Sequence, residues 1–442
     1  MEREALIVAK FGGTSVGSRE AILQLRSIVE KSPKLRVIVV SATSGTTNEL
    51  CALAENPHEL SILERVIDRH LKLANELKLV VIDQHGHRSK LYTLFDEMRA
   101  YCFAAQVEKI NFLLFRDHLL SFGEALSVAL LSEYLQAAVV DARELIITDD
   151  NFGEATPLEV KSEVLREALL YSQLVITAGF IGGTRAGTTT TLGRGGSDYS
   201  AALIARALNA DCLQIWTDVS GVYTCDPRSV PNAKSIPRMN QTVAAELAFW
   251  GAKVLHPATL LPIFNSNTKV WVGNTFAPEE AGTWIDSGTA VGDSAVQAIT
   301  FRPSQTIVTL IRVKKHNTYG FLARVFALLT KHKISVDHVT TSEISTSFTV
   351  YEPAMLTASP ILEELSELAE VKLENNFALI SLVGQNIIDR PHALEETWKL
   401  LNGHSVRSLY MGASKNNISF LIAESIAHTI VKKLHAHFLE LY

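Results

Sequence analysis

The stretch Thr191-Leu-Gly-Arg-Gly-Gly-Ser-Asp-Tyr-Ser-Ala-Ala-Leu203 crowds three glycines into a loop and then becomes a helical pattern. Glycine lets a backbone approach a ligand closely and adopt positive φ, and a helix start offers free N–H groups and partial positive charge to an anion. Arg194 is a forked cation suited to a carboxylate or a phosphate, and Asp198 falls in the first helical turn. A glycine turn capped by Ser197 would explain the loop and the helix. It would not explain Arg194 beside Asp198, so the stretch predicts a site for an anionic ligand.

Short apolar runs alternate with helical patterns on both sides of this loop. A helical pattern covers residues 19–30, and most of 50–135 is helical by periodicity. The alternation predicts an α/β fold with a mostly parallel sheet that helices cover on both faces. The predicted strands are residues 5–10, 36–41, 174–178 and 212–217. Ligands of such sheets bind at the carboxyl ends of the strands, and four glycine- or hydroxyl-rich segments lie just there: 10–13, 41–47, 179–183 and 217–218.

After about residue 292 the pattern changes to two similar units, each reading strand, loop, helix, strand, strand, helix. In the first unit we predict strands at 306–314, 334–341, 347–351 and 371–374, with helices at 321–331 and 360–369. In the second we predict strands at 378–383, 405–410 and 418–422, with helices at 391–401 and 425–437. The second unit lacks a last strand, which residues 296–301 could supply. The predicted domains are therefore 1–292, 303–376 and 377–442.

Composition restricts the class of protein. The 442 residues carry 41 Lys and Arg against 47 Asp and Glu, a net charge of -6 that argues against a nucleic-acid partner. Four separated cysteines indicate buried thiols in a reducing compartment. The charged start leads at once into a strand, and no run of 18 apolar residues occurs, so we expect no signal peptide, no membrane partner and a cytoplasmic protein.

The segment Lys10-Phe-Gly-Gly-Thr-Ser-Val-Gly17 places a cation at a strand end among three glycines. It differs from a Walker loop because its lysine precedes the glycines. The arrangement still suits a triphosphate, with backbone N–H groups below it and an ammonium above. A strand-turn-helix corner with an exposed lysine is the alternative. A dinucleotide site is disfavoured, because no G-x-G-x-x-G motif occurs.

Other polar candidates are weaker when each is taken alone. Tyr223 could line a nucleobase pocket and Arg228 could meet phosphate, although a long surface loop would explain residues 216–228 equally well. Lys253 is a further phosphate candidate. Glu124, predicted near a helix start, could hold an ammonium or could be a solvated helix-end residue.

Histidine pairs at 85/87 and 435/437 lack further ligands at useful spacing, so we predict no protein metal site. Magnesium needs no dedicated cage, because it binds largely through substrate phosphates and one or two carboxylates.

Together these motifs resemble the aspartate kinase family. Their combination is highly specific for this family, whereas each motif alone is not. The resemblance covers nearly the whole chain, although residues 52–110 match poorly. It is strongest for the monofunctional, lysine-sensitive type, and it implies an amino-acid kinase (carbamate kinase-like) domain followed by two α+β, ferredoxin-like ACT domains. The motifs that carry it are Lys10-Phe-Gly-Gly-Thr-Ser-Val, Gly-Phe-Ile-Gly at 179–182, Thr-Thr-Thr-Leu-Gly-Arg-Gly-Gly-Ser-Asp at 189–198, Trp-Thr-Asp-Val at 216–219 and Phe-Trp-Gly-Ala-Lys-Val-Leu-His-Pro at 249–257.

The resemblance also implies an activity. It is the ATP-dependent phosphorylation of the side-chain carboxylate of L-aspartate to 4-phospho-L-aspartate, with Mg²⁺. This is the first step of lysine and diaminopimelate, threonine and methionine biosynthesis. Feedback inhibition by L-lysine and a homodimer or homotetramer formed through the ACT domains are expected as well. A carboxylate nucleophile is already ionised at neutral pH, so we expect no catalytic histidine.

Residue roles follow from the motif matches. Lys10 and Asp198 are expected to be catalytic, and Thr47, Glu124 and Arg194 to bind the amino-acid substrate. The expected nucleotide-binding residues are Lys10, Gly12, Gly13, Thr217, Asp218, Tyr223, Arg228 and Lys253. The expected effector-binding residues are Gly320, Phe321, Leu322, Ser335, Val336, Asp337, Ser342 and Glu343, with Asp337 meeting the ammonium of lysine. Lys315 stands where the family's lysine pocket has an apolar residue.

Three alternatives remain open. The same fold could phosphorylate glutamate, acetylglutamate or a nucleoside monophosphate, although Glu124 with Arg194 suits a free amino acid. The chain could be a non-catalytic amino-acid sensor, which the intact charge pattern at Lys10, Arg194 and Asp198 argues against. A nicotinamide enzyme is disfavoured by the missing dinucleotide loop.

Overall fold

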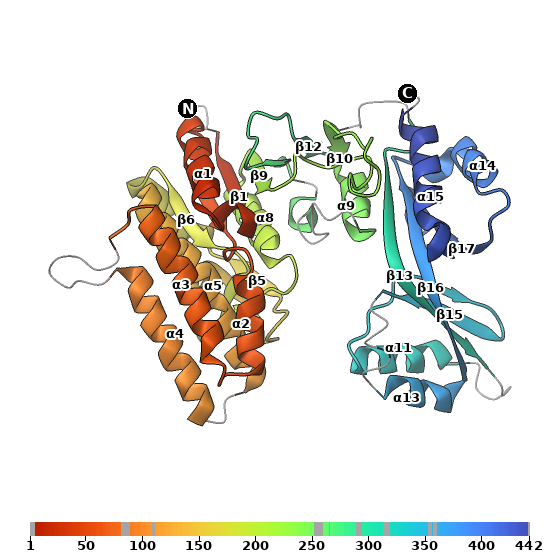
Figure 1. Cartoon of the computed structure of the whole chain (residues 1–442), viewed down its shortest axis with the longest axis horizontal. Coiled ribbons are helices and arrows are strands. Elements are labelled where there is room, and N and C mark those ends of the chain that lie inside the picture. The colour runs from red at the N-terminus through yellow and green to blue at the C-terminus, as the bar shows by residue number, and fades with distance from the viewer. Residues whose placement is uncertain are drawn as a thin grey trace. The chain divides into compact units, whose positions relative to one another are not determined.

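The computed structural model describes residues 5–80, 89–107, 111–251, 260–264, 266–288, 294–312, 319–351, 356 and 360–440. The chain divides into two compact units, each of which is described by itself (Figure 1). Unit 1 holds residues 1–222, 235–248 and 253–291, and unit 2 holds 223–234, 249–252 and 292–442. None of the described helices combines the length and the apolar character that crossing a membrane requires.

In the part of the chain described, unit 1 is built on an eight-stranded sheet of order β10-β12-β11-β9-β1-β2-β6-β3. Every neighbouring pair in it is parallel except β11 with β12, so the predicted mostly parallel α/β sheet is confirmed. The strands are β1 (Ile7–Phe11), β2 (Leu35–Val40), β3 (Ala138–Val139), β6 (Val175–Ala178), β9 (Cys212–Thr217), β10 (Arg238–Asn240), β11 (Lys269–Asn274) and β12 (Thr283–Asp286).

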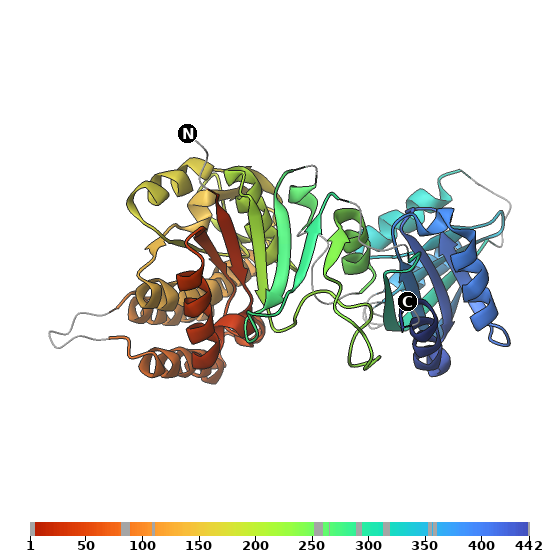
Figure 2. The same cartoon turned by 90° about the horizontal axis from the view of Figure 1, so that it is seen from above.

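Both faces of the central strands are covered, which is why these strands are apolar runs without alternation. Ala9 and Ile38 face one hydrophobic core, and Val8 and Val37, which point to the opposite face, are fully buried as well. Figures 1 and 2 show helices along both sides of this sheet. The described helices before unit 2 begins its sheet are α1 (Arg19–Lys31), α2 (Thr46–Glu55), α3 (Leu60–Glu76), α4 (Lys90–Val107), α5 (Phe112–Leu135), α6 (Ala142–Leu145), α7 (Ser162–Tyr171), α8 (Gly196–Leu208) and α9 (Gln241–Phe249).

A small four-stranded sheet of order β5-β4-β7-β8 completes the described part of unit 1. Its last strand ends at Thr191, so it delivers the chain directly into the glycine loop before α8. The strands are β4 (Ile146–Thr148), β5 (Pro157–Val160), β7 (Ile181–Thr184) and β8 (Thr189–Thr191).

Among its described residues, unit 2 carries one antiparallel six-stranded sheet of order β14-β15-β13-β16-β18-β17. Two helices lie at each end of its long strands β13 and β16 (Figure 1). The strands are β13 (Ala298–Ile311), β14 (Val339–Thr341), β15 (Ser345–Val350), β16 (Glu370–Val383), β17 (Val406–Met411) and β18 (Asn417–Ala423), and the helices are α11 (Phe321–Lys331), α13 (Ile361–Leu368), α14 (Pro391–Leu400) and α15 (Glu424–His435).

The long strands differ from the prediction. We expected strands 296–301 and 306–314 to be separate, and likewise 371–374 and 378–383, but each pair is one strand with an irregular register near Gln305. Ser304 and Asn376 adopt positive φ of 57° and 65° there, so the backbone bulges instead of turning back. The strand predicted at 334–341 was too long, since only Val339–Thr341 is a strand.

Two separate hydrophobic cores lie along this one sheet. Helices α11 and α13 pack on one end through Phe321, Val325 and Leu365. Helices α14 and α15 pack on the other end, where Val431 and Leu434 join strand residues of β16 and β18. Unit 2 therefore has the two α+β halves that were predicted, joined by two shared strands.

Candidate functional site

Lys10 and Asp198 form an ion pair at the carboxyl edge of the parallel sheet. Lys10 lies near the end of β1, and Asp198 lies in the first turn of α8, which begins after Gly195 in the left-handed conformation. The Nζ of Lys10 is 2.6 Å from Oδ1 of Asp198, and the two side chains are only 11% and 15% exposed. The sheet thus brings the two predicted catalytic residues together and holds the ammonium at the start of a helix.

The glycine loop after β1 passes close to both the lysine and the neighbouring strands. The N–H of Gly12 donates to the carbonyl of Trp216 at 3.0 Å. A Cβ on Gly12 would lie 3.5 Å from the Nζ of Lys10, and a Cβ on Gly13 would lie 2.8 Å from the carbonyl oxygen of Ala42. A Cβ on Gly12 would make only ordinary van der Waals contacts, whereas one on Gly13 would clash with the backbone after β2. Glycine is therefore required for close approach at position 13.

Glu124 is buried next to this pair, but not where we expected it in the helix. We predicted a position near a helix start, and that was wrong: Glu124 lies in the middle of α5. Gly123 beside it is a point of close packing inside the helix, because a Cβ there would lie 2.9 Å from the Cβ of Ala42. The N–H of Ala42 donates to Oε1 of Glu124 at 3.1 Å.

The second carboxylate oxygen of Glu124 is buried without a hydrogen-bond partner among the described residues. The side chain is 3% exposed, and its buried Oε2 accepts no hydrogen bond from the described residues. Burial raises the pKa of Glu124 to about 8, while the bond from Ala42 and the charge of Lys10 act in the opposite direction. A buried acceptor without a partner is costly, and an ammonium group would satisfy it.

The raised pKa of Glu124 makes a prediction about stability. A carboxyl whose folded-state pKa exceeds its unfolded value stabilises the fold below about pH 4.5, and this contribution is lost as pH rises through about 8. We expect the ligand-free wild-type protein to lose stability relative to Glu124→Gln between pH 5 and 8, by up to about 1.4 kcal/mol per pH unit. Melting temperatures over this range measure the effect. The exposed Glu133→Gln on the same helix is the control, and curves for Glu124→Gln and wild type that stay parallel would contradict the assignment.

Arg194 lines a cavity in unit 1. It is exposed in the loop between Gly193 and Gly195, and it forms no ion pair with another described residue. It lines a cavity of about 390 Å³ together with Glu154, Thr156, Tyr199 and other residues. A guanidinium on such a cavity wall is available for a bidentate contact with a carboxylate.

Sequence reasoning missed Asp117, which fixes the loops around Arg194. Asp117 is fully buried in α5 and accepts hydrogen bonds from the N–H of Gly153 (2.9 Å), the N–H of Thr191 (2.9 Å) and the hydroxyl of Thr191 (2.8 Å). Asp117 precedes Glu124 by two helical turns and so shares its helix face. The spacing of Asp117 from Glu124 was the sequence signal that could have identified Asp117 as a site residue.

Thr47 and the predicted nucleotide residues occupy different surroundings. Thr47 is half-buried in the first turn of α2, after Gly45 with φ of 86°. Thr217 ends β9, and its hydroxyl donates to Asp218 at 3.2 Å. Tyr223 and Arg228 belong to unit 2, where Arg228 pairs with Asp226 at 2.7 Å. Lys253 lies outside the described residues.

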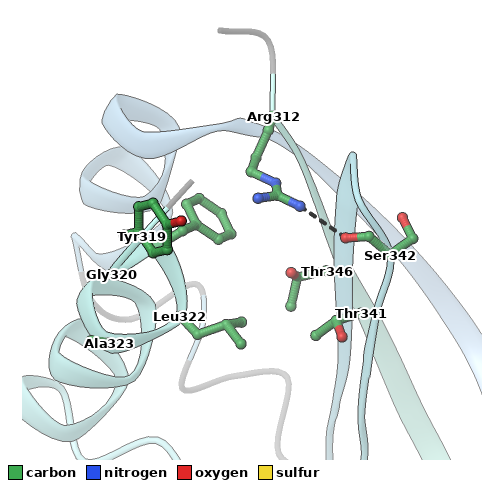
Figure 3. A pocket seen from close by; sticks show the side chains of 9 residues that line it. Arg312, Tyr319, Gly320, Leu322, Ala323, Thr341, Ser342 and Thr346 are labelled. Carbon is green, nitrogen blue, oxygen red and sulfur yellow. Dashed lines mark hydrogen bonds between the residues drawn. The ribbon is translucent and has the colours of Figure 1, made fainter. Parts of the chain in front are cut away.

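Part of the predicted effector set lines a second cavity, of about 500 Å³, in unit 2 (Figure 3). It lies between the start of α11 and the β14–β15 hairpin, and Arg312 reaches in from the end of β13 to donate to the carbonyl of Ser342 at 2.8 Å. The predicted residues that line it are Gly320, Phe321, Leu322 and Ser342, and the unpredicted ones are Arg312, Tyr319, Ala323, Thr341 and Thr346.

The other predicted effector residues do not line this cavity. Ser335 is exposed, Val336 is half-buried, and Glu343 contacts Arg312 through its carbonyl group. Asp337 forms an ion pair with Arg302. Burial raises the pKa of Asp337, and the charge of Arg302 opposes this rise only in part. Asp337 therefore faces a cation of its own chain. Lys315 lies outside the described residues.

No group of three His, Cys, Asp or Glu suitable for a metal ion occurs among the described residues.

Comparison with known proteins agrees with the fold. The model described as "Amino acid kinase family" matches residues 5–274, so the sheet, the glycine loops and the Lys10–Asp198 pair belong to a kinase of that class. Lysine-sensitive aspartokinase 3 of Escherichia coli (strain K12) is 38% identical over 98% of this chain and 99% of that protein. The chloroplastic aspartokinase 3 of Arabidopsis thaliana is 34% identical over 99% of this chain and 82% of that protein. The chain belongs to the aspartokinases.

Solved structures show the same relationship. E. coli aspartokinase III in complex with aspartate and ADP (R-state) superposes with a TM-score of 0.83 at 37% identity, over 98% of this chain and 99% of that chain. The same enzyme in complex with lysine and aspartate (T-state) gives a TM-score of 0.81 over the same shares. The predicted fold class, an amino-acid kinase domain with two ACT domains, is confirmed.

Proposed function

We propose that this enzyme transfers the γ-phosphoryl group of ATP to the side-chain carboxylate of L-aspartate, forming 4-phospho-L-aspartate. This product would enter lysine and diaminopimelate, threonine and methionine biosynthesis. The observation that carries the proposal is the buried Lys10–Asp198 pair at 2.6 Å, placed at the start of α8. The E. coli relative solved with aspartate and ADP supports the choice of substrates.

The chemistry needs alignment and neutralisation of charge more than acid–base catalysis. The aspartate carboxylate is ionised at neutral pH, and phosphoryl transfer depends on positioning and on cations that stabilise the charge of the phosphoryl oxygens. Lys10 would supply that cation, and Asp198 would hold its ammonium in place. The N–H groups of Gly13 and of the start of α8 would add further donors, whereas the N–H of Gly12 is already bonded to the carbonyl of Trp216.

Two groups would grip the amino acid itself. Glu124, with its buried Oε2 unpaired among the described residues, would accept the α-ammonium, and Arg194 would bind the α-carboxylate. Thr47, in the first turn of α2, would complete this subsite. The nucleotide would be bound by Lys10 with Thr217, Asp218, Tyr223, Arg228 and Lys253.

Mg²⁺ fits this donor set as an ion that arrives with ATP. Asp198 and Asp218 are the carboxylates of the proposed nucleotide site, and an ion held mainly by phosphates needs one or two protein ligands. When bound, it neutralises phosphate charge.

A panel of amino acids in a coupled assay of ADP release tests the proposal. We expect ATP-dependent ADP release with L-aspartate, and at least about 100-fold lower kcat/KM with glutamate or acetylglutamate, since positioning of a longer chain against the phosphate fails. Equal or faster release with glutamate would identify a different amino-acid kinase. No ADP release with any amino acid, together with tight binding of one, would identify a non-catalytic sensor.

We also propose that the cavity in unit 2 binds L-lysine as a feedback inhibitor, which the relative's lysine complex supports. The free N–H groups at the start of α11, beyond Gly320, and the guanidinium of Arg312 suit the effector's carboxylate. Because Asp337 is paired with Arg302, lysine would have to displace that cation to use it. The domains would be 1–292 for the kinase, and 303–376 and 377–442 for the two ACT domains, with strand 296–301 completing the second.

Filling the cavity tests its role as the effector site. Leu322 lines it and is 39% exposed, so Leu322→Trp would occupy space without entering a core. We expect the lysine concentration for half-inhibition to rise at least about tenfold, within the usual range of coupling free energies, while the KM values for ATP and aspartate stay within about twofold of wild type. Leu409→Trp, on β17 of the same sheet and 38% exposed, is the matched control. Unchanged inhibition in Leu322→Trp would place the effector elsewhere.

The surface beside this cavity also suits self-association. Tyr319, Val339 and Ile344 are 96%, 40% and 66% exposed around β14, which is an edge strand. Apolar side chains on a sheet edge favour pairing with a second chain. We therefore propose a homodimer or homotetramer formed through the ACT domains, which light scattering of the full chain measures directly.

A further inference from the structure

One segment of the proposed nucleotide site is built into the regulatory unit. Residues 223–234, which include Tyr223 and Arg228, belong to unit 2, although the residues before and after them belong to unit 1. Cys225 and Val230 are 4% and 3% exposed and pack in the same hydrophobic core as α15. The backbone N–H of Ile299 on β13 donates to the carbonyl of Thr224 at 2.8 Å. The segment therefore has fixed attachment points among regulatory residues.

A buried histidine stands at the main attachment point. His435 ends α15 and is 0% exposed. Its Nε2 is 2.9 Å from the hydroxyl of Thr224, and its Nδ1 is 2.9 Å from Oε1 of Glu440. The described chain after α15 continues as a π-helical turn, Ala436–Glu440, whose wider spacing places Glu440 beside His435. Glu440 also accepts a hydrogen bond from the amide of Asn232 at 3.2 Å.

The partners of the imidazole determine the direction of each hydrogen bond. An ionised carboxylate can only accept, so Nδ1–H donates to Glu440. Bonds from His435 and Asn232 lower the pKa of Glu440, which keeps it ionised. In a neutral imidazole that carries its proton on Nδ1, Nε2 is an acceptor, so the hydroxyl of Thr224 donates to it, and this hydroxyl also accepts the N–H of Lys234 at 2.9 Å. Each polar group in this chain of bonds is satisfied, and together they hold Thr224 and Asn232, near the two ends of the segment.

We propose that His435 is a positioning residue for nucleotide binding, acting through Thr224 and Glu440 on the segment that carries Tyr223 and Arg228. The inference rests on the proposed function of that segment. His435 touches neither substrate. It fixes the two ends of the segment against the core of the regulatory unit, so that the exposed part between them keeps one conformation. Ordering the segment before ATP arrives reduces the entropy that binding must overcome.

Steady-state kinetics of the full chain, with KM for ATP and for aspartate measured separately, test the proposal. His435→Ala and Thr224→Val should each raise the KM for ATP about tenfold, the usual effect of losing a buried hydrogen bond. The KM for aspartate should change less than about twofold. The double variant should be no worse than either single one, because both break the same link. His435→Gln, whose amide can still accept from Thr224, should restore most of the affinity for ATP.

A matched variant separates positioning from general destabilisation. Ser381 and Ser419 share a buried hydrogen bond of 2.7 Å on β16 and β18 of the same unit, and neither belongs to the segment. Ser381→Ala should lower the melting temperature comparably and leave the KM for ATP unchanged. Equal KM values for ATP in His435→Ala, Thr224→Val and Ser381→Ala would overturn the inference. If His435→Ala fails to fold, Thr224→Val and His435→Gln carry the same comparison.

Arg228→Ala distinguishes failure of the inference from failure of the proposed function. Suppose that Arg228→Ala raises the KM for ATP while His435→Ala and Thr224→Val keep wild-type values. The segment would then bind nucleotide without needing the hydrogen bonds of His435, and the inference alone would be overturned. A wild-type KM for ATP in Arg228→Ala would overturn the segment's proposed role and the inference with it.

Discussion

Lys10→Ala is expected to lower kcat by about 10²- to 10³-fold, the usual cost of removing one preorganised electrostatic donor from an active site. In the proposed mechanism Lys10 supplies the positive charge that stabilises the transferred phosphoryl group, and its 2.6 Å contact with Asp198 would hold the ammonium in position. The effect should fall mainly on kcat, because the interaction strengthens as charge develops in transfer. Single-turnover measurements of ADP formation with saturating ATP and aspartate measure it.

Two further variants make this prediction sharper. Lys34→Ala removes an exposed lysine just before β2 and should leave turnover unchanged. Asp198→Asn should lower kcat as well, and the double variant Lys10→Ala/Asp198→Asn should cost less than the sum of the two, since the residues act as one unit. Near wild-type turnover in Lys10→Ala would exclude this lysine from the chemistry.

Arg194→Ala is expected to raise the KM for aspartate about 100-fold, which is the upper range for one charge-assisted hydrogen-bonded contact. The KM for ATP should change little, because the proposed nucleotide residues lie on other loops. Asp117 and the glycines beside Arg194 should keep the loop folded without the side chain. Arg185→Ala, exposed in the turn after β7, is the matched control. A raised KM for ATP with an unchanged KM for aspartate would show that Arg194 binds the nucleotide.

The sequence predicted the kinase fold well, because its signals are local. The apolar runs that became β1, β2, β6 and β9 are buried on both faces, so periodicity and burial agree. The start of α8 was also predicted from the glycine loop. Gly195 adopts a φ of 73° there, a left-handed conformation that glycine adopts without strain. The catalytic roles expected of Lys10 and Asp198 came from the motif match, and the structure places the two side chains in contact.

Errors arose where a residue serves a distant contact instead of a local one. Glu124 was predicted near a helix start, but it lies in the middle of α5, where Gly123 packs closely against Ala42. Strands 296–301 and 306–314, and likewise 371–374 and 378–383, were predicted as separate, but each pair is one strand with an irregularity near Ser304 or Asn376. The same local sequence can end a helix or strand or lie inside it, and the residue that packs against it decides which of the two occurs.

Buried polar partners could not be predicted from sequence for the same reason. Arg302 pairs with Asp337 from 35 residues away, and Thr224 pairs with His435 from 211 residues away. Arg312, just after β13, lines the proposed effector cavity although nothing in the sequence marked it as functional. These contacts depend on the shared strands of unit 2, which the sequence divided differently.

The central claim is that the side-chain carboxylate of aspartate becomes phosphorylated. An acyl phosphate reacts with hydroxylamine to give a hydroxamate, so trapping during turnover with ATP and Mg²⁺ identifies the carboxyl group that accepted phosphate. Mass spectrometry of the trapped product should show the β-hydroxamate of aspartate, in amounts equal to the ADP released, and Lys10→Ala should form it about 10²- to 10³-fold more slowly. ADP release from aspartate without a hydroxamate, or with the hydroxamate on the α-carboxyl group, would contradict the proposed reaction.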